Sequence, residues 1–255
     1  MTFAILIEGH GSGVGMESAV EVHANKLKEH FGDRVRIGYS RLGKPSIEES
    51  VEQIVRDGYT KMVVVPMFYA PGWFTDGNTM KRFNVNPATR HGSYLVGSAN
   101  LEVFVTRMFI TDERMNTIVS DIVASHSDKS EGILLLGHGS KDGRNLRISL
   151  TFKDILVSRG YDVECCSNEF DHPDLEEGVG LLAPRHKKII ILPMFVSPSN
   201  HTRVEIPEKL GIDAKSREGD VQSRNGTVHV AMLDELGLCP EITPILADLI
   251  GESGF

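Results

Sequence analysis

The sequence predicts an α/β protein built from two similar lobes, each a doubly wound parallel sheet, that face each other across a cleft. Two observations lead to this fold. The chain of 255 residues contains an internal duplication, and within each copy short apolar runs alternate with segments that have the periodicity of helices. A chain of this length is sufficient for one large domain or for two of average size.

The duplication is visible as three pairs of matching segments at a nearly constant separation. They pair residues 4–12 (AILIEGHGS) with 133–140 (ILLLGHGS), 44–47 (KPSI) with 172–175 (HPDL), and 62–68 (MVVVPMF) with 189–195 (IIILPMF). Because the matches occur in the same order, we divide the chain into lobes of residues 1–127 and 128–255. The polar stretch 125–130 joins them.

Each lobe begins with a strand, and three more strands follow it, separated by helices. Short apolar runs predict strands at 3–7, 35–39, 62–66 and 94–97, and again at 132–136, 162–166, 188–192 and 228–232. Apolar residues recur at helical spacing in three groups: Met16, Ala19, Val20, Leu27 and Phe31; Ile47, Val51, Ile54 and Val55; and Ile242, Ile245, Leu246, Leu249 and Ile250. Strands that are apolar throughout are buried on both faces, which favours parallel sheets covered by helices.

Composition and charge exclude several classes of function. Hydrophobic residues make up 40% and charged residues 24%, which is the balance of an ordinary soluble globular protein. The formal net charge of -8 argues against a nucleic-acid-binding protein or a polybasic membrane binder, because both need a cationic surface. The N-terminus has neither the basic flank nor the long apolar core of a signal peptide, and no apolar run is long enough to span a bilayer. The three cysteines form no disulfide framework, so we expect a cytoplasmic protein.

Three residues of the second copy stand where successive strands end. His138 follows the first strand, Glu169 follows the second, and His201 follows the loop after the third. Ligands of doubly wound sheets bind beyond the carboxyl ends of the strands, so we expect these side chains to converge. Each residue alone would be an ordinary loop residue, and it is the joint placement that favours a metal site. Two imidazoles and one carboxylate suit cobalt, nickel, iron or zinc, and they leave coordination positions open for a substrate.

The first copy provides an internal comparison. Its corresponding residues are His10, Arg41 and Phe74. A guanidinium group repels a metal cation and a phenyl ring offers no ligand atom, so this set is unsuited to a metal. We therefore expect one metal site, in the lobe of residues 128–255.

The motifs resemble those of the class II chelatases, specifically the sirohydrochlorin cobaltochelatases and ferrochelatases, over nearly the whole chain in two copies. The second copy carries the G-H-G-S turn at 137–140, Glu169 before an H-P step, an apolar strand ending in P-M-F, then His201 and an acidic-Ile-Pro segment at 205–207. The resemblance implies ATP-independent insertion of a divalent metal, commonly Co²⁺, into sirohydrochlorin or a related reduced tetrapyrrole in cobalamin- or siroheme-type cofactor biosynthesis. The metal is then a substrate, with Ni²⁺ or Fe²⁺ as alternatives, and no organic cofactor is expected.

The resemblance and the residue types together assign roles. His138, Glu169 and His201 hold the incoming metal, and a histidine released from the metal, or His10 of the first lobe, accepts a pyrrole proton. Trp73, beside a Pro-Gly step, is expected to face the macrocycle in the cleft. Because sirohydrochlorin carries several carboxylates, we expect cations near the rims to bind them: Arg41, Lys141, Arg144 and Arg203.

Two other functions stay open at this point. Arg90, His91 and Gly92 form the tripeptide of histidine phosphatases, but they follow a loop and not an N-terminal strand, so a chance match is favoured. A phosphatase assay would separate that activity from metal insertion. The other alternative is a carrier on a decayed chelatase fold, which binds metal and macrocycle without joining them. We expect a monomer or a weak homo-oligomer, because a duplicated chain can replace a dimer.

Overall fold

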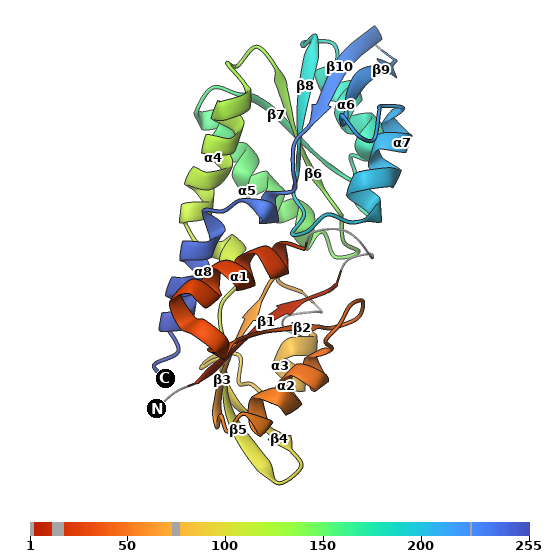
Figure 1. Ribbon diagram of the computed structural model, residues 1–255. Helices are drawn as coiled ribbons and strands as arrows, with labels where there is room; N and C mark the ends of the chain where they lie inside the picture. The colour runs from red at the N-terminus through yellow and green to blue at the C-terminus, as the bar shows by residue number, and fades with distance from the viewer. Residues whose placement is uncertain (1–2, 12–17, 73–76, 225) are drawn as a thin grey trace. The chain divides into compact units, whose positions relative to one another are not determined.

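The computed structural model describes residues 3–11, 18–72, 77–224 and 226–255. It divides into two compact units (Figure 1). Unit 1 comprises the residues up to Asp112 together with Cys239–Phe255, and unit 2 comprises Glu113–Leu238. Each unit is built on one five-stranded sheet, and the two sheets have the same strand order. The predicted duplication of an α/β lobe is therefore confirmed.

The sheet of unit 1 has the order β2-β1-β3-β5-β4, with β4 antiparallel to β5 and the other pairs parallel. Its strands are β1 (Ala4–Gly9), β2 (Val35–Tyr39), β3 (Lys61–Pro66), β4 (His91–Val96) and β5 (Ala99–Val105). Its helices are α1 (Ala19–Phe31), α2 (Ile47–Arg56), the single turn α3 (Met80–Arg82) and α8 (Ile242–Gly251), with 3-10 turns η1 (Gly32–Arg34) and η3 (Phe109–Thr111). Every residue of β1 is buried, Glu8 included, as expected of a strand that is covered on both faces.

The sheet of unit 2 repeats this arrangement in the order β7-β6-β8-β10-β9. Its strands are β6 (Gly132–Gly137), β7 (Asp162–Ser167), β8 (Lys188–Pro193), β9 (Glu218–Ser223) and β10 (Gly226–Met232). Its helices are α4 (Arg114–His126), α5 (Arg144–Ser158), α6 (Leu175–Leu182) and α7 (Ile206–Leu210), with the π-helical turn η4 (His201–Glu205) before α7 and the 3-10 turn η5 (Leu236–Leu238). β6 is buried throughout and lies between β7 and β8.

The helices after β2 and β7 begin in the same way in both units. Ser46 caps α2 in a capping box with Glu49, and Asp174 caps α6 in a capping box with Glu177. In each box the cap side chain accepts a backbone N–H, and the glutamate accepts the N–H of the cap residue. The matching segments found in the sequence thus mark the same local structure.

The edge strands differ from the prediction. Four parallel strands were expected in each lobe, whereas each sheet has a fifth, antiparallel strand at its edge, β4 or β9. The strand expected at 94–97 falls largely within β4, and the parallel strand beside β3 is β5. Most residues of β4 and β9 are exposed or half-buried. In unit 1 the prediction thus found the edge strand and missed β5, whose apolar residues are interrupted by Asn100 and Glu102. In unit 2 it found β10 and missed the edge strand β9, which has no continuous apolar run.

The closing helix of each sequence repeat packs in the other unit. α4 ends the first repeat but belongs to unit 2, where it contacts α5, and α8 ends the second repeat but belongs to unit 1, where it contacts α1 and β3 (Figure 1). In unit 1, Nδ1 of His23 in α1 lies 2.8 Å from Oγ1 of Thr243 in α8. The compact units therefore differ from the lobes 1–127 and 128–255 by an exchange of these two helices.

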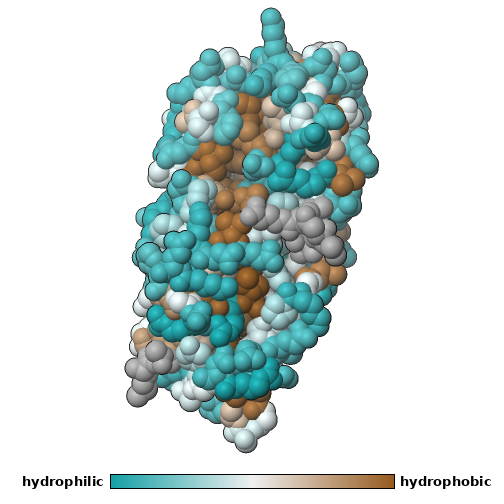
Figure 2. All heavy atoms as spheres, viewed as in Figure 1, coloured by the Kyte–Doolittle hydropathy of each residue, from teal (hydrophilic) through white to brown (hydrophobic). Residues whose placement is uncertain are grey.

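Hydrophilic side chains cover most of the face shown in Figure 2, and apolar side chains appear there in patches. Among the described residues, the large apolar side chains that are exposed are Leu42, Leu95, Leu150, Val157, Phe170, Leu181 and Val204. Within the same ranges of the chain, none of the helices has the length and hydropathy needed to cross a membrane.

Candidate metal site

Three strands of unit 2 end at one edge of its sheet, and each leads to a predicted ligand. β6 pairs in parallel with β7 on one side and β8 on the other. His138 directly follows β6, Glu169 lies two residues after β7, and His201 opens the turn η4 after the loop that follows β8. The chain crosses over on both sides of β6, so this edge is the topological switch point, where such sheets bind ligands.

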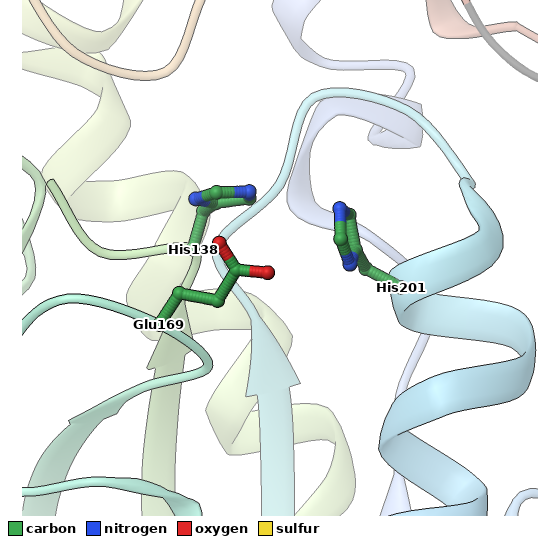
Figure 3. Close-up of side chains that lie close together, drawn as sticks. All are labelled: His138, Glu169 and His201. Atoms are coloured by element: carbon green, nitrogen blue, oxygen red, sulfur yellow. The ribbon is translucent and has the colours of Figure 1, made fainter.

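The side chains of these three residues converge (Figure 3). One potential ligand atom from each of His138, Glu169 and His201 lies within 4.8 Å of the others. The two imidazole rings are 5.1 Å apart between centroids and nearly perpendicular, with an interplanar angle of 88°. All three side chains are half-buried, so an ion bound between them would keep a side open to a substrate.

A glycine allows the ends of β6 and β7 to approach. Gly139 has a φ of +89°, and a Cβ atom there would lie 1.7 Å from the carbonyl oxygen of Glu169. The N–H of Glu169 donates to the carbonyl of His138 at 3.0 Å, and the N–H of Asn168 donates to that of Gly137 at 2.9 Å. Any other residue at position 139 would separate the two strand ends and move Glu169 away from His138.

Glu205 orients the imidazole of His201. Its Oε2 atom lies 2.6 Å from Nδ1 of His201, and its Oε1 atom accepts a hydrogen bond from Nδ2 of Asn200 at 2.8 Å. The bond to His201 is the main cause that holds the pKa of Glu205 below its ordinary value. With Nδ1 engaged, Nε2 is the nitrogen left to bind an ion. In the sequence Glu205 begins the acidic-Ile-Pro segment, and its four-residue spacing from His201 indicates this role only once the turn is known to be helical.

Aromatic rings border His138. The rings of Phe170 and Phe195 each lie 6.1 Å from its imidazole, Phe170 nearly parallel at 28° and Phe195 tilted at 62°. Nδ1 of His138 is 3.3 Å from the carbonyl oxygen of Gly139, a long hydrogen bond. Phe195 ends the apolar P-M-F segment of the sequence, whereas no sequence pattern points to Phe170.

The ligand set fits a first-row transition metal. Neutral imidazoles and a carboxylate are borderline ligands that suit cobalt, nickel, iron and zinc, whereas calcium and magnesium prefer oxygen alone. Three protein ligands leave at least one coordination position free. The geometry of His138, Glu169 and His201 is therefore that of a site which can take up a metal and present it to a second ligand.

Unit 1 has the same backbone without the ligand set. His10 follows β1 as His138 follows β6. The N–H of Leu42, and not that of Arg41, donates to the carbonyl of His10 at 3.0 Å, so Leu42 takes the backbone place of Glu169. The separation of the repeats in the sequence had paired Arg41 with Glu169. Neither Arg41 nor Leu42 has a side chain that binds a metal ion. Phe74 lies outside the described residues.

Among the residues that the structure describes, no group of three close ligands includes His10. A second group does occur in unit 2, formed by His172, Asp174 and Glu177, all exposed. Its two carboxylates serve the capping box of α6, and Nδ1 of His172 lies 2.9 Å from Oε2 of Glu177. The position of these three side chains is therefore explained by their role in capping the N-terminus of α6.

The predicted substrate cations lie in different surroundings. The Lys141 ammonium lies over the ring of Phe170, 5.9 Å from its centroid. Arg144, the first residue of α5, pairs with Asp142 at 3.0 Å. Arg41 is exposed in unit 1, and Trp73 lies outside the described residues.

Arg203 is part of an ion-pair network inside unit 2. Its Nη2 atom contacts Oδ1 of Asp234 at 3.2 Å and Oε2 of Glu235 at 2.5 Å. The side chain of Glu235 is fully buried, and Arg217 also faces it, at 3.6 Å. A buried carboxylate needs such partners, so these contacts tie the turn that carries His201 to the segment after β10.

The tripeptide Arg90-His91-Gly92, which matches that of histidine phosphatases, has a structural role at the start of β4. Arg90 has a φ of +61° and donates from Nε and Nη2 to the carbonyls of Val105 and Thr106. Arg217 occupies the same place before β9, with a φ of +59°. The guanidinium of Arg90 is therefore engaged by the main chain at the start of an edge strand, which disfavours phosphotransfer chemistry there.

The comparisons with known proteins agree with the duplication. The CbiX family model matches the chain twice, over residues 4–125 and 132–253. A sirohydrochlorin cobaltochelatase from Saccharolobus islandicus is 30% identical over 123 residues, which cover 48% of this chain and 94% of that protein. One from Methanococcus maripaludis is 33% identical over 92 residues, covering 35% of this chain and 64% of that protein.

Solved structures share the fold over the full length. SirB from Bacillus subtilis with Fe³⁺ has a TM-score of 0.71 and 19% identity, covering 99% of this chain and 95% of that one. CbiX, described as the terminal enzyme for biosynthesis of siroheme in denitrifying bacteria, has a TM-score of 0.63 and 15% identity, covering 98% and 99%. At these identities the likeness shows the fold.

Proposed function

Because the chain belongs to the CbiX family, we propose that it inserts a divalent metal ion, Co²⁺ first among the candidates, into sirohydrochlorin or a related reduced tetrapyrrole without ATP. The observation that carries this proposal is the convergence of His138, Glu169 and His201 at the edge of the sheet of unit 2. The names of the curated relatives, sirohydrochlorin cobaltochelatases, support the choice of substrate and metal.

The three side chains first take up the metal. His138 and His201 bind it as neutral imidazoles, and Glu169 offsets one of its two positive charges. Glu205 holds the ring of His201 in place through the bond to Nδ1. Because the group is half-buried, the ion keeps a face toward the incoming macrocycle, whose nitrogens replace the protein ligands one after another.

Proton release balances the reaction. The free macrocycle gives up two pyrrole N–H protons when its nitrogens bind a divalent metal, so the products are the metallated macrocycle and two protons. A base must accept each proton, and each imidazole released from the metal becomes available for this. His10 belongs to unit 1, and its part in proton transfer stays a prediction.

The ligand set itself accepts more than one metal. Affinity of such sites rises from Fe²⁺ through Co²⁺ to Ni²⁺, so selection in the cell depends on availability as well as on ligands. Insertion of Ni²⁺ or Fe²⁺ is therefore the alternative form of the same activity.

The decisive experiment is anaerobic incubation of the protein with sirohydrochlorin and each of Co²⁺, Ni²⁺ and Fe²⁺, followed by absorbance. We expect a spectral change at a rate well above the reaction without protein, and loss of that excess in His138→Ala. Binding of both metal and macrocycle without accelerated insertion would identify a carrier. Absence of binding and insertion alike would refute the proposal.

A further inference from the structure

Phe170, the residue after Glu169, has two properties that are unfavourable on their own. Its apolar side chain is 57% exposed. Its φ is +66°, in the left-handed region that a bulky L-residue enters only at a cost in free energy. An exposed side chain recovers little of that cost through burial, and strained residues of this kind gather at functional sites.

In the first repeat the corresponding backbone position also has a positive φ, but a glycine occupies it, so it is not strained. In the hydrogen-bond register at the strand ends, Leu42 takes the place of Glu169, so the next residue, Gly43, takes the place of Phe170. Gly43 also has a positive φ, +117°, which glycine adopts freely. The repeat that contains the metal-ligand group thus carries a phenyl ring where the other repeat carries glycine.

The backbone on both sides of Phe170 is anchored. The N–H of Glu169 donates to the carbonyl of His138 at 3.0 Å, and the N–H of Asp171 donates to the carbonyl of Glu169 at 2.8 Å. Oδ2 of Asp171 accepts the N–H of Ser140, also at 2.8 Å. These bonds hold the phenyl ring beside the imidazole of His138, 6.1 Å between centroids and nearly parallel.

A cation stands over the same ring. The ammonium of Lys141 is 5.9 Å from the centroid of Phe170, within the range of a cation–π contact. The strand edge therefore presents a flat apolar surface and a positive charge next to the metal-ligand group. A tetrapyrrole has the complementary chemistry, with flat apolar faces and carboxylates around its rim.

We propose that Phe170 is a substrate-binding residue whose ring packs against the tetrapyrrole while the metal is transferred. This inference rests on the proposed function. To receive an ion held by His138, Glu169 and His201, the macrocycle must bring its central nitrogens to that ion, and its rim then extends over the residues that border the group. Phe170 is one of these bordering residues, because its ring lies beside that of His138. The ammonium of Lys141, over the ring of Phe170, is placed to attract a carboxylate of the rim.

The test compares Phe170→Gly with Phe170→Tyr in the full-length protein. Glycine keeps the left-handed backbone and removes the ring, and tyrosine keeps the ring. Val157→Ala, which shortens an exposed apolar side chain on α5, is the control. Three quantities are measured for each: the Kd of sirohydrochlorin without metal, the KM of sirohydrochlorin at saturating Co²⁺, and the Kd of Co²⁺ alone.

We expect Phe170→Gly to raise the Kd and KM for sirohydrochlorin about tenfold, the loss of one aromatic contact, with the Kd of Co²⁺ unchanged. Phe170→Tyr and Val157→Ala should resemble the wild type. An unchanged Kd and KM in Phe170→Gly overturns the inference, as does an equal loss of Co²⁺ affinity, because the ring would then act only through His138. A wild type that binds sirohydrochlorin but inserts no metal refutes the proposed enzyme, and the binding data still decide on Phe170.

Discussion

Oε2 of Glu205 and Nδ1 of His201 lie 2.6 Å apart, one helical turn from each other on η4. Partners that orient a metal-binding histidine commonly contribute ten- to a hundredfold to metal affinity. We expect Glu205→Ala to weaken Co²⁺ binding by about that factor, measured by calorimetry. Glu208→Gln changes an exposed carboxylate on the following helix and should have no effect. Equal affinities in Glu205→Ala and the wild type would show that the bond does not support the site.

The two repeats allow a matched pair of histidine variants. His138→Ala removes one of the three converging ligands, and Co²⁺ affinity should fall more than about a hundredfold, beyond the effect of a supporting residue. His10→Ala changes the corresponding residue of unit 1, which belongs to no ligand group among the described residues. Its Co²⁺ affinity should equal that of the wild type. The prediction is wrong if both variants lose affinity to the same extent.

Glu8 makes the stability of unit 1 depend on pH. Its side chain is fully buried, Oε2 accepts a hydrogen bond from Thr79 at 2.8 Å, and burial raises its pKa from 4.5 to about 7. The folded state thus favours the protonated acid. Between pH 4.5 and 7 stability falls as pH rises, and above pH 7 the full cost, about 3 kcal/mol, is present.

The second repeat supplies the variant that tests this. Leu136 stands in β6 where Glu8 stands in β1, and the carbonyls of both accept a methionine N–H at 2.8 Å, from Met194 and Met67. Glu8→Leu should remove the loss of stability between pH 5 and pH 8, measured by urea unfolding at both values. The same loss in Glu8→Leu as in the wild type would assign the pH dependence to other groups.

The exchange of closing helices predicts where core mutations act. Leu246 of α8 is fully buried in unit 1, and Met115 of α4 is fully buried in unit 2. Replacement of either by alanine should cost about 2–5 kcal/mol. Hydrogen exchange should accelerate in β1 and β3 for Leu246→Ala, and in β6 and β8 for Met115→Ala. The opposite pattern would show that each helix stabilises its own sequence repeat.

Much of the fold could be predicted because the central strands are apolar on both faces. β1, β3, β6 and β8 appear in the sequence as continuous apolar runs. β5 and β9 were missed because polar residues interrupt them. The exchange of α4 and α8 leaves no local signal, since an apolar helix face has the same sequence whichever sheet it covers. Helical periodicity shows that one face of a helix is buried, but it does not show which sheet that face packs against.

The convergence of His138, Glu169 and His201 could be predicted because parallel strands of known order end at one edge. The supporting residues could not. The role of Glu205 depends on a helical turn that begins at His201, and the sequence predicted no helix there. Phe170 is an exposed residue in a short loop, and its significance depends on a backbone angle that no sequence pattern reports.

Unit 2 is one continuous stretch of chain, whereas unit 1 is assembled from both chain ends. Synthesis proceeds from the N-terminus, and domains fold as they leave the ribosome. All of unit 2 is therefore synthesised before α8, and the surface of unit 1 that α8 covers stays uncovered until α8 has been made. The half that carries the metal-ligand group is completed first, although its sequence comes second.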